Sequence, residues 1–279
     1  MKGLIKKALY RTLGRRGMRR LLRAVRGRQA IFLETELIHD YFDGRHQGTM
    51  VDVGAHFGES FMDYLEDGWR VLAFEPDPEN RRRLEATCDV RKLRLRDEAV
   101  SNKELKEASF FASDESTGIS SLSAFRPSHH EIRKVDVTTM RKALAEEKIQ
   151  QVDFLKIDTE GHDLFVLKGF PWDEQRPEVI LCEFEDSKTA ALGYDYRSMG
   201  DFLREQKYEV FLSEWFPIVR YGVEHRWRRW ARYPAAVEDS AAWGNFVAFR
   251  EGSDLSRIEP YLKEQAVKLT GVQQAAGQL

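Results

Sequence analysis

TMVDVGAHFGESFMDYLEDGWRVLAFEP, residues 49–76, alternates between two kinds of pattern. A short apolar run at 49–53 leads into a turn with glycine, and residues 57–68 then carry apolar side chains at helical spacing. A second apolar run follows at 70–74. Strands that alternate with helices at this spacing are typical of parallel sheets with right-handed crossovers. We therefore predict an open, mostly parallel α/β sheet.

The same alternation continues along most of the chain. Further helices are predicted at residues 76–88, 139–148, 162–170 and 196–206. Further strands or extended segments are predicted at residues 90–95, 106–113, 152–157, 177–184, 208–213 and 243–250. Because no repeat and no long linker interrupts the pattern, we expect residues 31–251 to form one domain. The whole chain of 279 residues is close to the upper limit for a single hydrophobic core.

The net charge of −2 hides an uneven distribution of charged residues. Residues 1–28 contain eleven Lys or Arg and no acid, whereas the remainder contains 33 bases and 46 acids. We expect residues 1–30 to form a basic helical arm that is solvated or caps the domain. The alternative is a helix at 1–28 that lies on the inner face of an anionic membrane. Residues 252–279 are expected to form a C-terminal helix and a frayed tail.

Cysteine usage and hydropathy favour a cytoplasmic protein. Cys88 and Cys182 lie far apart and have no metal-ligand spacing. Two cysteines are too few for a disulfide framework, so a reducing compartment is expected. No run of about 18 apolar residues is present, and we expect no transmembrane helix. The N-terminus lacks the apolar core and the cleavage site of a secretory signal.

The ends of the first two predicted strands favour a nucleoside site, because ligands of such sheets bind beyond the carboxyl ends of the strands. Gly54 and Gly58 bracket the turn after the first strand and allow a close approach of the backbone to a ligand. The turn lacks the third glycine of the dinucleotide fingerprint and the Lys-Ser/Thr of a phosphate loop. Glu75 follows Gly54 by 21 residues, where an acid can accept hydrogen bonds from both hydroxyls of a ribose. An ordinary turn and a solvated glutamate are the structural alternatives.

Several segments that occur in order resemble a known family: DVGAHFGES, FEPDPENRRRLE, EAVSNKE, STGISSLS, FLKIDTEGHDLFVLKGF and EVILCEFE. Together they resemble the FkbM family of S-adenosylmethionine-dependent methyltransferases, over roughly residues 48–215. The resemblance implies a Rossmann-like class I methyltransferase fold, with a mostly parallel seven-stranded sheet whose last strand is antiparallel. It also implies methyl transfer to a hydroxyl oxygen, often of a sugar or a secondary metabolite.

The resemblance also implies a set of cofactor contacts. The residues that would hold the methionine end of S-adenosylmethionine are Asp52, Gly54, Ala55, His56 and Gly58. Glu75 would hold the ribose, and Glu98 and Ala99 would lie near the adenine. Family members often carry Asn at the position of His56, so the local hydrogen bonds are expected to differ. The Ser-rich segment 116–122 would close over the cofactor or the acceptor, or form a flexible polar loop.

Asp158 and Glu160 form a pair of acids at the end of the predicted strand 152–157. If the chain stays extended, both carboxylates point to the same side. We assign Asp158 to the junction between cofactor and acceptor, and Glu160 to acceptor orientation or base work. His162 is a third candidate base, because its ordinary pKa suits neutral pH. The alternatives are a helix N-cap or first-turn acid for Glu160 and a surface helix residue for His162. No third ligand with convincing spacing is present, so we assign no metal site.

Two further features are candidates for acceptor contacts. Glu183 and Glu185 end the strand at 177–184 on one face, and Glu183 is assigned to acceptor recognition or to a structural role. The segment 214–234 contains three Trp, two Tyr, five Arg and one His. Such a mixture binds nucleic acid or sugars by stacking, or it forms an amphipathic helix that packs Trp227 and Trp230. We interpret residues 214–236 as an acceptor-site insertion, and its candidate contacts are Tyr221, His225 and Trp227.

The expected function is therefore O-methylation of a sugar, a glycolipid, a polysaccharide or a related hydroxylated metabolite. One alternative is a nucleic-acid (RNA) methyltransferase. Against it, the strand at 152–157 ends in DTEG rather than in the motif of base N-methylation, and the acidic body opposes phosphate. Another alternative is a non-catalytic binding module, which the glycine turn, Glu75 and the paired acids disfavour.

Overall fold

The computed structural model describes residues 34–42, 45, 47–88, 93–220 and 225–259. The basic arm predicted at 1–30 and most of the tail predicted at 252–279 lie outside these residues, so both stay predictions. None of the helices in these ranges combines the length and the hydropathy that a membrane span requires.

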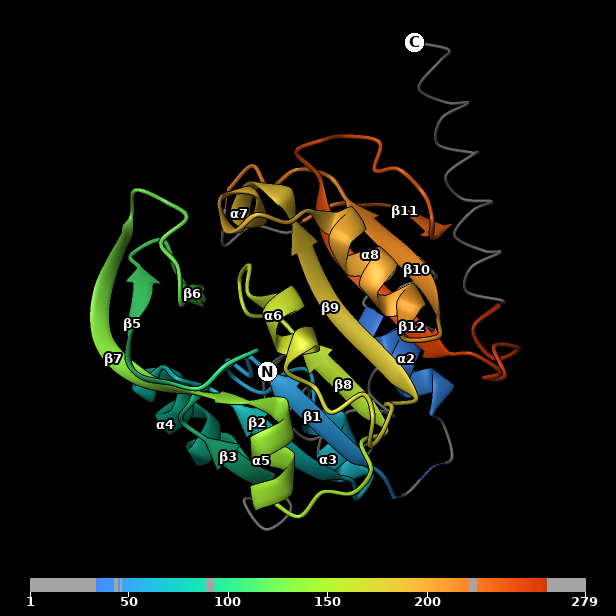
Figure 1. The fold of residues 1–279 in the computed structure, drawn as a ribbon, viewed down its shortest axis with the longest axis horizontal. Helices are drawn as coiled ribbons and strands as arrows, with labels where there is room; N and C mark the ends of the chain where they lie inside the picture. The colour runs from blue at the N-terminus through green and yellow to red at the C-terminus, as the bar shows by residue number, and fades with distance from the viewer. Residues whose placement is uncertain (1–33, 43–44, 46, 89–92, 221–224, 260–279) are drawn as a thin grey trace, which may run out of the picture.

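The main sheet has eight strands in the order β11-β10-β12-β9-β8-β1-β2-β3 (Figure 1). Its strands are β1 Thr49–Val53, β2 Arg70–Phe74, β3 Leu93–Arg96, β8 Phe154–Ile157, β9 Val179–Glu185, β10 Tyr208–Trp215, β11 Trp227–Arg232 and β12 Trp243–Arg250. Neighbouring strands from β3 to β9 are parallel, whereas β12 is antiparallel to both β9 and β10. The predicted class I methyltransferase sheet is confirmed, and β11 adds an eighth strand at its edge.

The segment around Trp227 and Trp230 forms a strand, so the helical alternative for it is wrong. β11 pairs antiparallel with β10, where Trp227 lies opposite Trp215 and Trp230 opposite Ser213. The ring of Trp230 stacks on Phe211 with centroids 5.6 Å apart. Aromatic side chains fit a pleated surface when a neighbouring strand offers a partner, and the free edge of β10 does so here.

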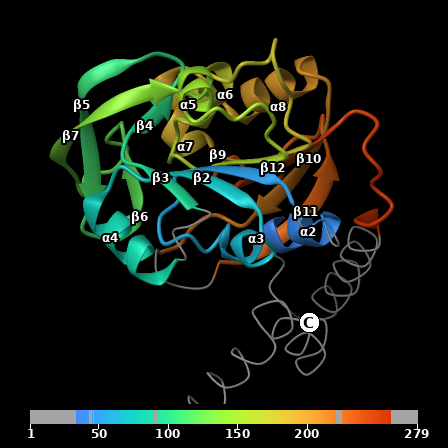
Figure 2. The same ribbon diagram turned by 90° about the horizontal axis from the view of Figure 1, so that it is seen from below.

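Helices cover both faces of the main sheet (Figure 2). They are α2 Glu34–Tyr41, α3 Met62–Glu66, α4 Pro78–Thr87, α5 Met140–Glu146, α6 Asp163–Lys168, α7 Asp186–Thr189, the short 3-10 helix η1 Ala190–Leu192 and α8 Tyr196–Glu205. One buried cluster contains side chains of α5, α6 and α8, and the other contains side chains of α2, α3 and α4. The prediction of a helix over 57–68 holds only for α3, because left-handed residues at His56 and Gly58 keep the chain in a turn.

A second sheet of four strands stands beside the main sheet, in the order β4-β7-β5-β6 (Figure 1). Its strands are β4 Ala99–Ser101, β5 Leu105–Ser113, β6 Ser116–Ser121 and β7 His129–Thr139. Only β5 was expected from the sequence. Most of the Ser-rich segment forms β6, so it is a strand rather than a flexible loop. Ser121 Oγ donates a hydrogen bond of 3.0 Å to the carbonyl of Glu160, which ties β6 to the carboxyl end of β8.

Candidate active site

The carboxyl ends of β1 and β8 approach each other closely at Gly54. This residue has a φ of 85°, and a Cβ placed on it would lie 1.9 Å from the carbonyl oxygen of Asp158. The left-handed backbone and the contact both require glycine. The turn continues through left-handed conformations at His56 (φ 47°) and Gly58 (φ 78°). The predicted role of Gly54 in a close approach therefore involves β8 as well as any ligand.

A buried ion pair between Lys156 and Asp52 stabilises this turn. Lys156 Nζ lies 3.1 Å from Asp52 Oδ1 and 3.4 Å from Asp158 Oδ2, and it donates a hydrogen bond of 2.7 Å to the Gly54 carbonyl. Burial lowers the pKa of Lys156, but the two carboxylates outweigh it and the net shift is upward. Asp52 is fully buried and also accepts a hydrogen bond from Ser60. Asp52 therefore acts on the turn rather than facing a cavity.

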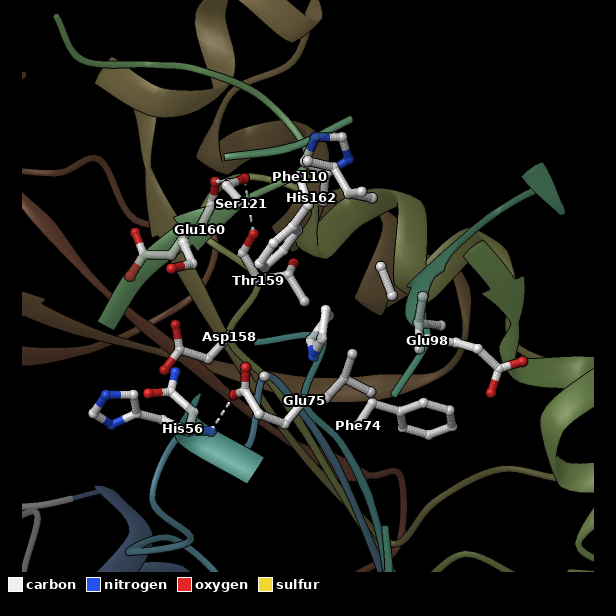
Figure 3. A pocket seen from close by; sticks show the side chains of 18 of the residues that line it. His56, Phe74, Glu75, Glu98, Phe110, Ser121, Asp158, Thr159, Glu160 and His162 are labelled. Carbon is white, nitrogen blue, oxygen red and sulfur yellow. Dashed lines mark hydrogen bonds between the residues drawn. The ribbon is translucent and has the colours of Figure 1, made fainter. Parts of the chain in front are cut away.

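Glu75 ends β2 as a buried carboxylate. Its Oε2 accepts a hydrogen bond of 2.7 Å from the backbone N–H of His56 (Figure 3). Its Oε1 accepts one of 2.9 Å from the backbone N–H of Asp77. Burial raises the pKa of Glu75 to about 7, although these hydrogen bonds oppose the shift. The two backbone donors fix the carboxylate at the rim of a cavity.

This first cavity has a volume of about 190 Å³ and is lined by both sheets (Figure 3). The predicted cofactor residues that line it are Gly54, His56, Glu75, Glu98 and Ala99. Asp52, Ala55 and Gly58 are not among its lining residues. Both oxygens of Glu98 accept hydrogen bonds from Arg96, at 2.6 and 2.9 Å, which fixes that side chain.

The first cavity fits the adenosine part of S-adenosylmethionine. Ala99 and Phe110 offer apolar walls, and Glu75 offers a carboxylate to a ribose. His162 Nδ1 is buried and has no hydrogen-bond partner within the described part of the chain, so a polar ligand atom could bond to it. Unpartnered buried polar atoms are rare unless a ligand or water completes them.

His162 lies at the N-cap of α6, and its Nε2 is 2.8 Å from Ser123 Oγ. Burial lowers its pKa to about 4, so the ring is neutral at neutral pH. The alternative of an exposed helix residue is wrong, because the side chain is partly buried in the wall of the first cavity. These properties suit a wall residue better than a base, and catalysis by His162 stays a prediction.

The paired acids are brought together with a third. Asp158, Glu160 and Glu183 each place a carboxylate oxygen within 4.8 Å of the others. The chain is not extended here, because Glu160 (φ 55°) and Gly161 (φ 99°) adopt left-handed conformations. Glu160 therefore reaches Asp158 through a turn, and it is not the first-turn acid of α6, which is Asp163.

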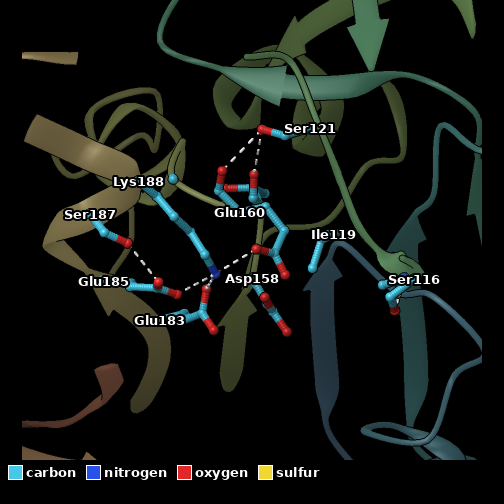
Figure 4. A network of polar contacts seen from close by, with 12 residues as sticks. Ser116, Ile119, Ser121, Asp158, Glu160, Glu183, Glu185, Ser187 and Lys188 are labelled. Atoms are coloured by element: carbon cyan, nitrogen blue, oxygen red, sulfur yellow. Dashed lines mark hydrogen bonds and ion pairs between the residues drawn. The ribbon is translucent and has the colours of Figure 1, made fainter. Parts of the chain in front are cut away.

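Lys188 of α7 is a residue of this group that the sequence did not single out. Its Nζ lies 2.5 Å from Glu160, 2.9 Å from Glu183 and 2.9 Å from Glu185, and its side chain is 2% exposed (Figure 4). The expectation that Glu183 and Glu185 share a face is confirmed by this shared partner. Its position three residues after Glu185 is the feature of the sequence that could have indicated an ion pair between the two.

The excess of carboxylates over cations at Lys188 affects proton binding. Burial raises the pKa of Glu160 to about 7, and Lys188 reduces this shift without cancelling it. A base with a pKa near the working pH is effective in proton transfer. The three carboxylates could also bridge a divalent cation, with Glu183 as the third ligand that the sequence did not reveal. Lys188 already supplies positive charge to two of them.

A second cavity, of about 510 Å³, meets the first at Gly54, His56 and Asp158. Of the predicted acceptor contacts, His225 lines it. Trp227 does not line it. Its indole donates a hydrogen bond of 2.9 Å to Ser213 Oγ of β10. Tyr221 lies outside the described residues. Lining residues that the sequence did not single out include Glu34, Trp215 and Trp243.

Three of the five arginines of the segment 214–234 are paired with acids. Arg228 and Arg229 lie 3.0 and 2.7 Å from Glu214, and Arg232 lies 2.6 Å from Glu209. These pairs reduce the positive charge that the segment can offer to a polyanion.

One comparison with known proteins identifies a family. A sequence model of the methyltransferase FkbM domain matches residues 52–210. A search of curated proteins found no matching relative. Precorrin-6y C5,15-methyltransferase from Geobacter metallireducens is similar in structure, with a TM-score of 0.40 and 13% identity over 80% of this chain and 92% of that chain.

Two further solved structures are similar at the same level. Magnesium protoporphyrin IX methyltransferase from Synechocystis, solved with bound SAM, has a TM-score of 0.40 and 7% identity over 78% of this chain and 77% of that chain. TrmK from M. capricolum, in complex with S-adenosyl-homocysteine, has a TM-score of 0.40 and 8% identity over 79% of this chain and 70% of that chain. Similarities of this size carry no argument about substrate.

Proposed function

The chain belongs to the FkbM methyltransferase family, and from that premise we propose that it methylates a hydroxyl group of a sugar, a glycolipid, a polysaccharide or a related metabolite. Its cofactor is S-adenosylmethionine, as in the rest of the family. When bound, the cofactor supplies an electrophilic methyl group on a sulfonium centre. The residues of the chain bind the cofactor, align the acceptor and accept the hydroxyl proton.

The first cavity is the proposed site of the adenosine. Glu75 would accept hydrogen bonds from the ribose hydroxyls, and its backbone partners hold it in place for them. Ala99 and Phe110 would contact the flat base, and His162 would bond to one of its polar atoms.

Asp158 and Glu160 are the proposed catalytic carboxylates. The Asp158 side chain is 42% exposed and lines both cavities, so its charge lies where donor and acceptor would meet. Glu160 lines the first cavity and not the second, but its carboxylate lies within 4.8 Å of that of Asp158. With a pKa of about 7 it would receive the proton of an acceptor hydroxyl through Asp158 near neutral pH. Lys188 contacts Glu160 and fixes the direction of its carboxylate.

One observation carries the proposal: the two cavities share Gly54, His56 and Asp158. A donor in the first cavity and an acceptor in the second would therefore meet beside a carboxylate. Methyl transfer is an in-line displacement, and most of its acceleration comes from holding the two reactants close and aligned.

A nucleic-acid acceptor is less well supported. Binding to phosphates depends on lysines and arginines that are free to replace counterions. Arg228, Arg229 and Arg232 instead contact acids of β10. A non-catalytic module is disfavoured because the carboxylates of Asp158, Glu160 and Glu183 are brought together.

Calorimetry with S-adenosylmethionine tests the donor site, and release of S-adenosylhomocysteine with a panel of sugars and glycolipids tests transfer. Asp158→Asn and Glu160→Gln should each lower turnover by about 100-fold or more, with little change in melting temperature. Glu205→Gln is the matched control, since this exposed acid of α8 lines neither cavity. Near-normal turnover in both acid variants would remove the pair from the mechanism. Absence of cofactor binding would refute the proposal.

A further inference from the structure

Glu34 of α2 is a buried acid in the wall of the second cavity, and it organises that wall. The residue is 5% exposed, and its Oε1 accepts hydrogen bonds from Ser213 Oγ at 2.6 Å, Trp215 Nε1 at 2.8 Å and Asn245 Nδ2 at 3.2 Å. No described residue donates a hydrogen bond to its Oε2. Oε1 therefore holds side chains of β10 and β12 in place, and among the described residues no donor competes with a cavity ligand for Oε2.

Aromatic side chains form another part of the same wall. The rings of Trp215 and Trp243 lie 5.3 Å apart at 30°, and the ring of His225 meets Trp243 edge-on at 5.3 Å. The indole of Trp243 donates a hydrogen bond of 3.1 Å to the carbonyl of Phe216. These contacts fix the rings without a ligand, and a preorganised wall reduces the entropy cost of binding.

Negative charge dominates among the described residues that line the second cavity. Its acids are Glu34, Glu36, Glu59, Asp63 and Asp158. Glu36 and Asp63 take part in other interactions, so Glu34, Glu59 and Asp158 supply the charge that a ligand would meet. Lys156 is the one lysine or arginine among these lining residues, and it already contacts Asp52 and Asp158. Burial lowers the pKa of His56, so this ring adds no charge at neutral pH.

We propose that the second cavity is the acceptor site and that it selects a hydroxylated ring that is uncharged or carries an amine. The proposal rests on the proposed function and names the acceptor class. The aromatic wall suits the apolar face of a sugar ring, and the carboxylates accept hydrogen bonds from hydroxyl or ammonium groups. Phosphorylated, sulfated or carboxylated acceptors are rejected, because like charges brought together at a binding site are strongly unfavourable.

The test compares sugars that differ in charge and little else. Methyl hexosides, 2-amino-2-deoxyhexoses, uronic acids and hexose 6-phosphates are titrated in several ring configurations onto the full chain saturated with S-adenosylhomocysteine. Saturation with the product fills the donor site, so the probes report on the acceptor site alone. Binding is followed by ligand-observed NMR, and methyl transfer is measured in parallel with S-adenosylmethionine. Anionic members should bind at least about tenfold more weakly than their neutral counterparts.

Glu34→Gln sharpens the test, because glutamine keeps an oxygen for the three donors and removes the charge. Amino sugars should lose about tenfold in affinity, while neutral sugars stay within about threefold. Glu205→Gln should change neither class. Collapse of the wall would weaken both classes equally and would count against the proposal, as would equal binding of anionic sugars or no binding of any neutral or amino sugar. Failure to bind S-adenosylhomocysteine would instead overturn the proposed function.

Discussion

Lys188 is a buried ammonium that contacts Glu160, Glu183 and Glu185, and three carboxylates exceed the charge of one lysine. Removal of charges from water is costly unless each finds a partner. The group resolves this imbalance by keeping protons, and the pKa of Glu160 is raised to about 7. The same imbalance that costs stability therefore provides a base that works near neutral pH.

Replacement of Lys188 by methionine is predicted to affect stability and the pH profile together. Loss of the buried cation leaves the acids unpaired and should lower the free energy of unfolding by about 3–5 kcal/mol. The pKa of Glu160 should rise further, so the rising limb of turnover against pH should move to higher pH. Urea unfolding and a pH–rate profile check both. Lys142→Met, which breaks the exposed pair of Lys142 with Glu104, should leave both measurements nearly unchanged.

Glu75 predicts a pH dependence for the donor. Its pKa of about 7 lies above the ordinary value of 4.5, so the carboxyl gains a proton as the pH falls below about 7. The ionised form accepts hydrogen bonds from a ribose, and affinity for S-adenosylmethionine should fall about tenfold between pH 8 and pH 6. Calorimetry at several pH values measures this. Glu75→Gln should bind more weakly at pH 8 and lose the pH dependence, whereas a persistent dependence would assign it to another group.

At the scale of elements, buried parallel strands were the easiest to predict. The apolar runs at 49–53 and 70–74 coincide with β1 and β2, since strands covered on both faces read as continuous apolar runs. The second sheet was not predicted apart from β5. β7 carries mostly polar, exposed side chains over much of its length, and β4 has three residues. Neither gives a hydrophobic period that a sequence reader could use.

Some residues of the site can likewise be placed from the local sequence, whereas others cannot. Gly54 and Glu75 follow their strands directly, so local sequence indicates their position. Glu34 and Asn245 meet only after α2 and β12 have packed, across a separation that no local pattern encodes. The identity of the acid partners of Lys188 likewise depends on how α7 turns back over the ends of β8 and β9.

Replacement of Gly54 tests the close approach between the ends of β1 and β8. An alanine there must adopt a left-handed backbone and displace the carbonyl of Asp158, so Gly54→Ala should lower the free energy of unfolding by about 2–5 kcal/mol and abolish cofactor binding. Gly193→Ala separates the two effects. Gly193 has a similar φ of 83° but nothing within 4 Å of its Cβ, so it should cost about 1–2 kcal/mol and keep cofactor binding. Equal losses in the two variants would show that the contact with β8 is unimportant.

For the whole molecule, the first cavity joins the two sheets. Gly54, Glu75 and Asp158 come from strand ends of the main sheet, whereas Phe110 and Ser121 come from β5 and β6 of the second. The direct link from Ser121 to Glu160 also crosses between the sheets. A ligand in this cavity would therefore contact parts of the chain that share few other contacts, and its binding energy would be distributed over both sheets.

This arrangement predicts the pattern of protection on cofactor binding. Hydrogen–deuterium exchange with saturating S-adenosylhomocysteine should slow in the turn after β1, at 54–60, and also across β5 and β6, because a ligand that holds both sheets suppresses their local opening. α8 packs against β10 and lines neither cavity, so its exchange should not change beyond the global stabilisation. Protection confined to 54–60 would mean that the second sheet does not contact the cofactor, and the assignment of Ala99 and Phe110 to the base would then fail while that of Glu75 could stand.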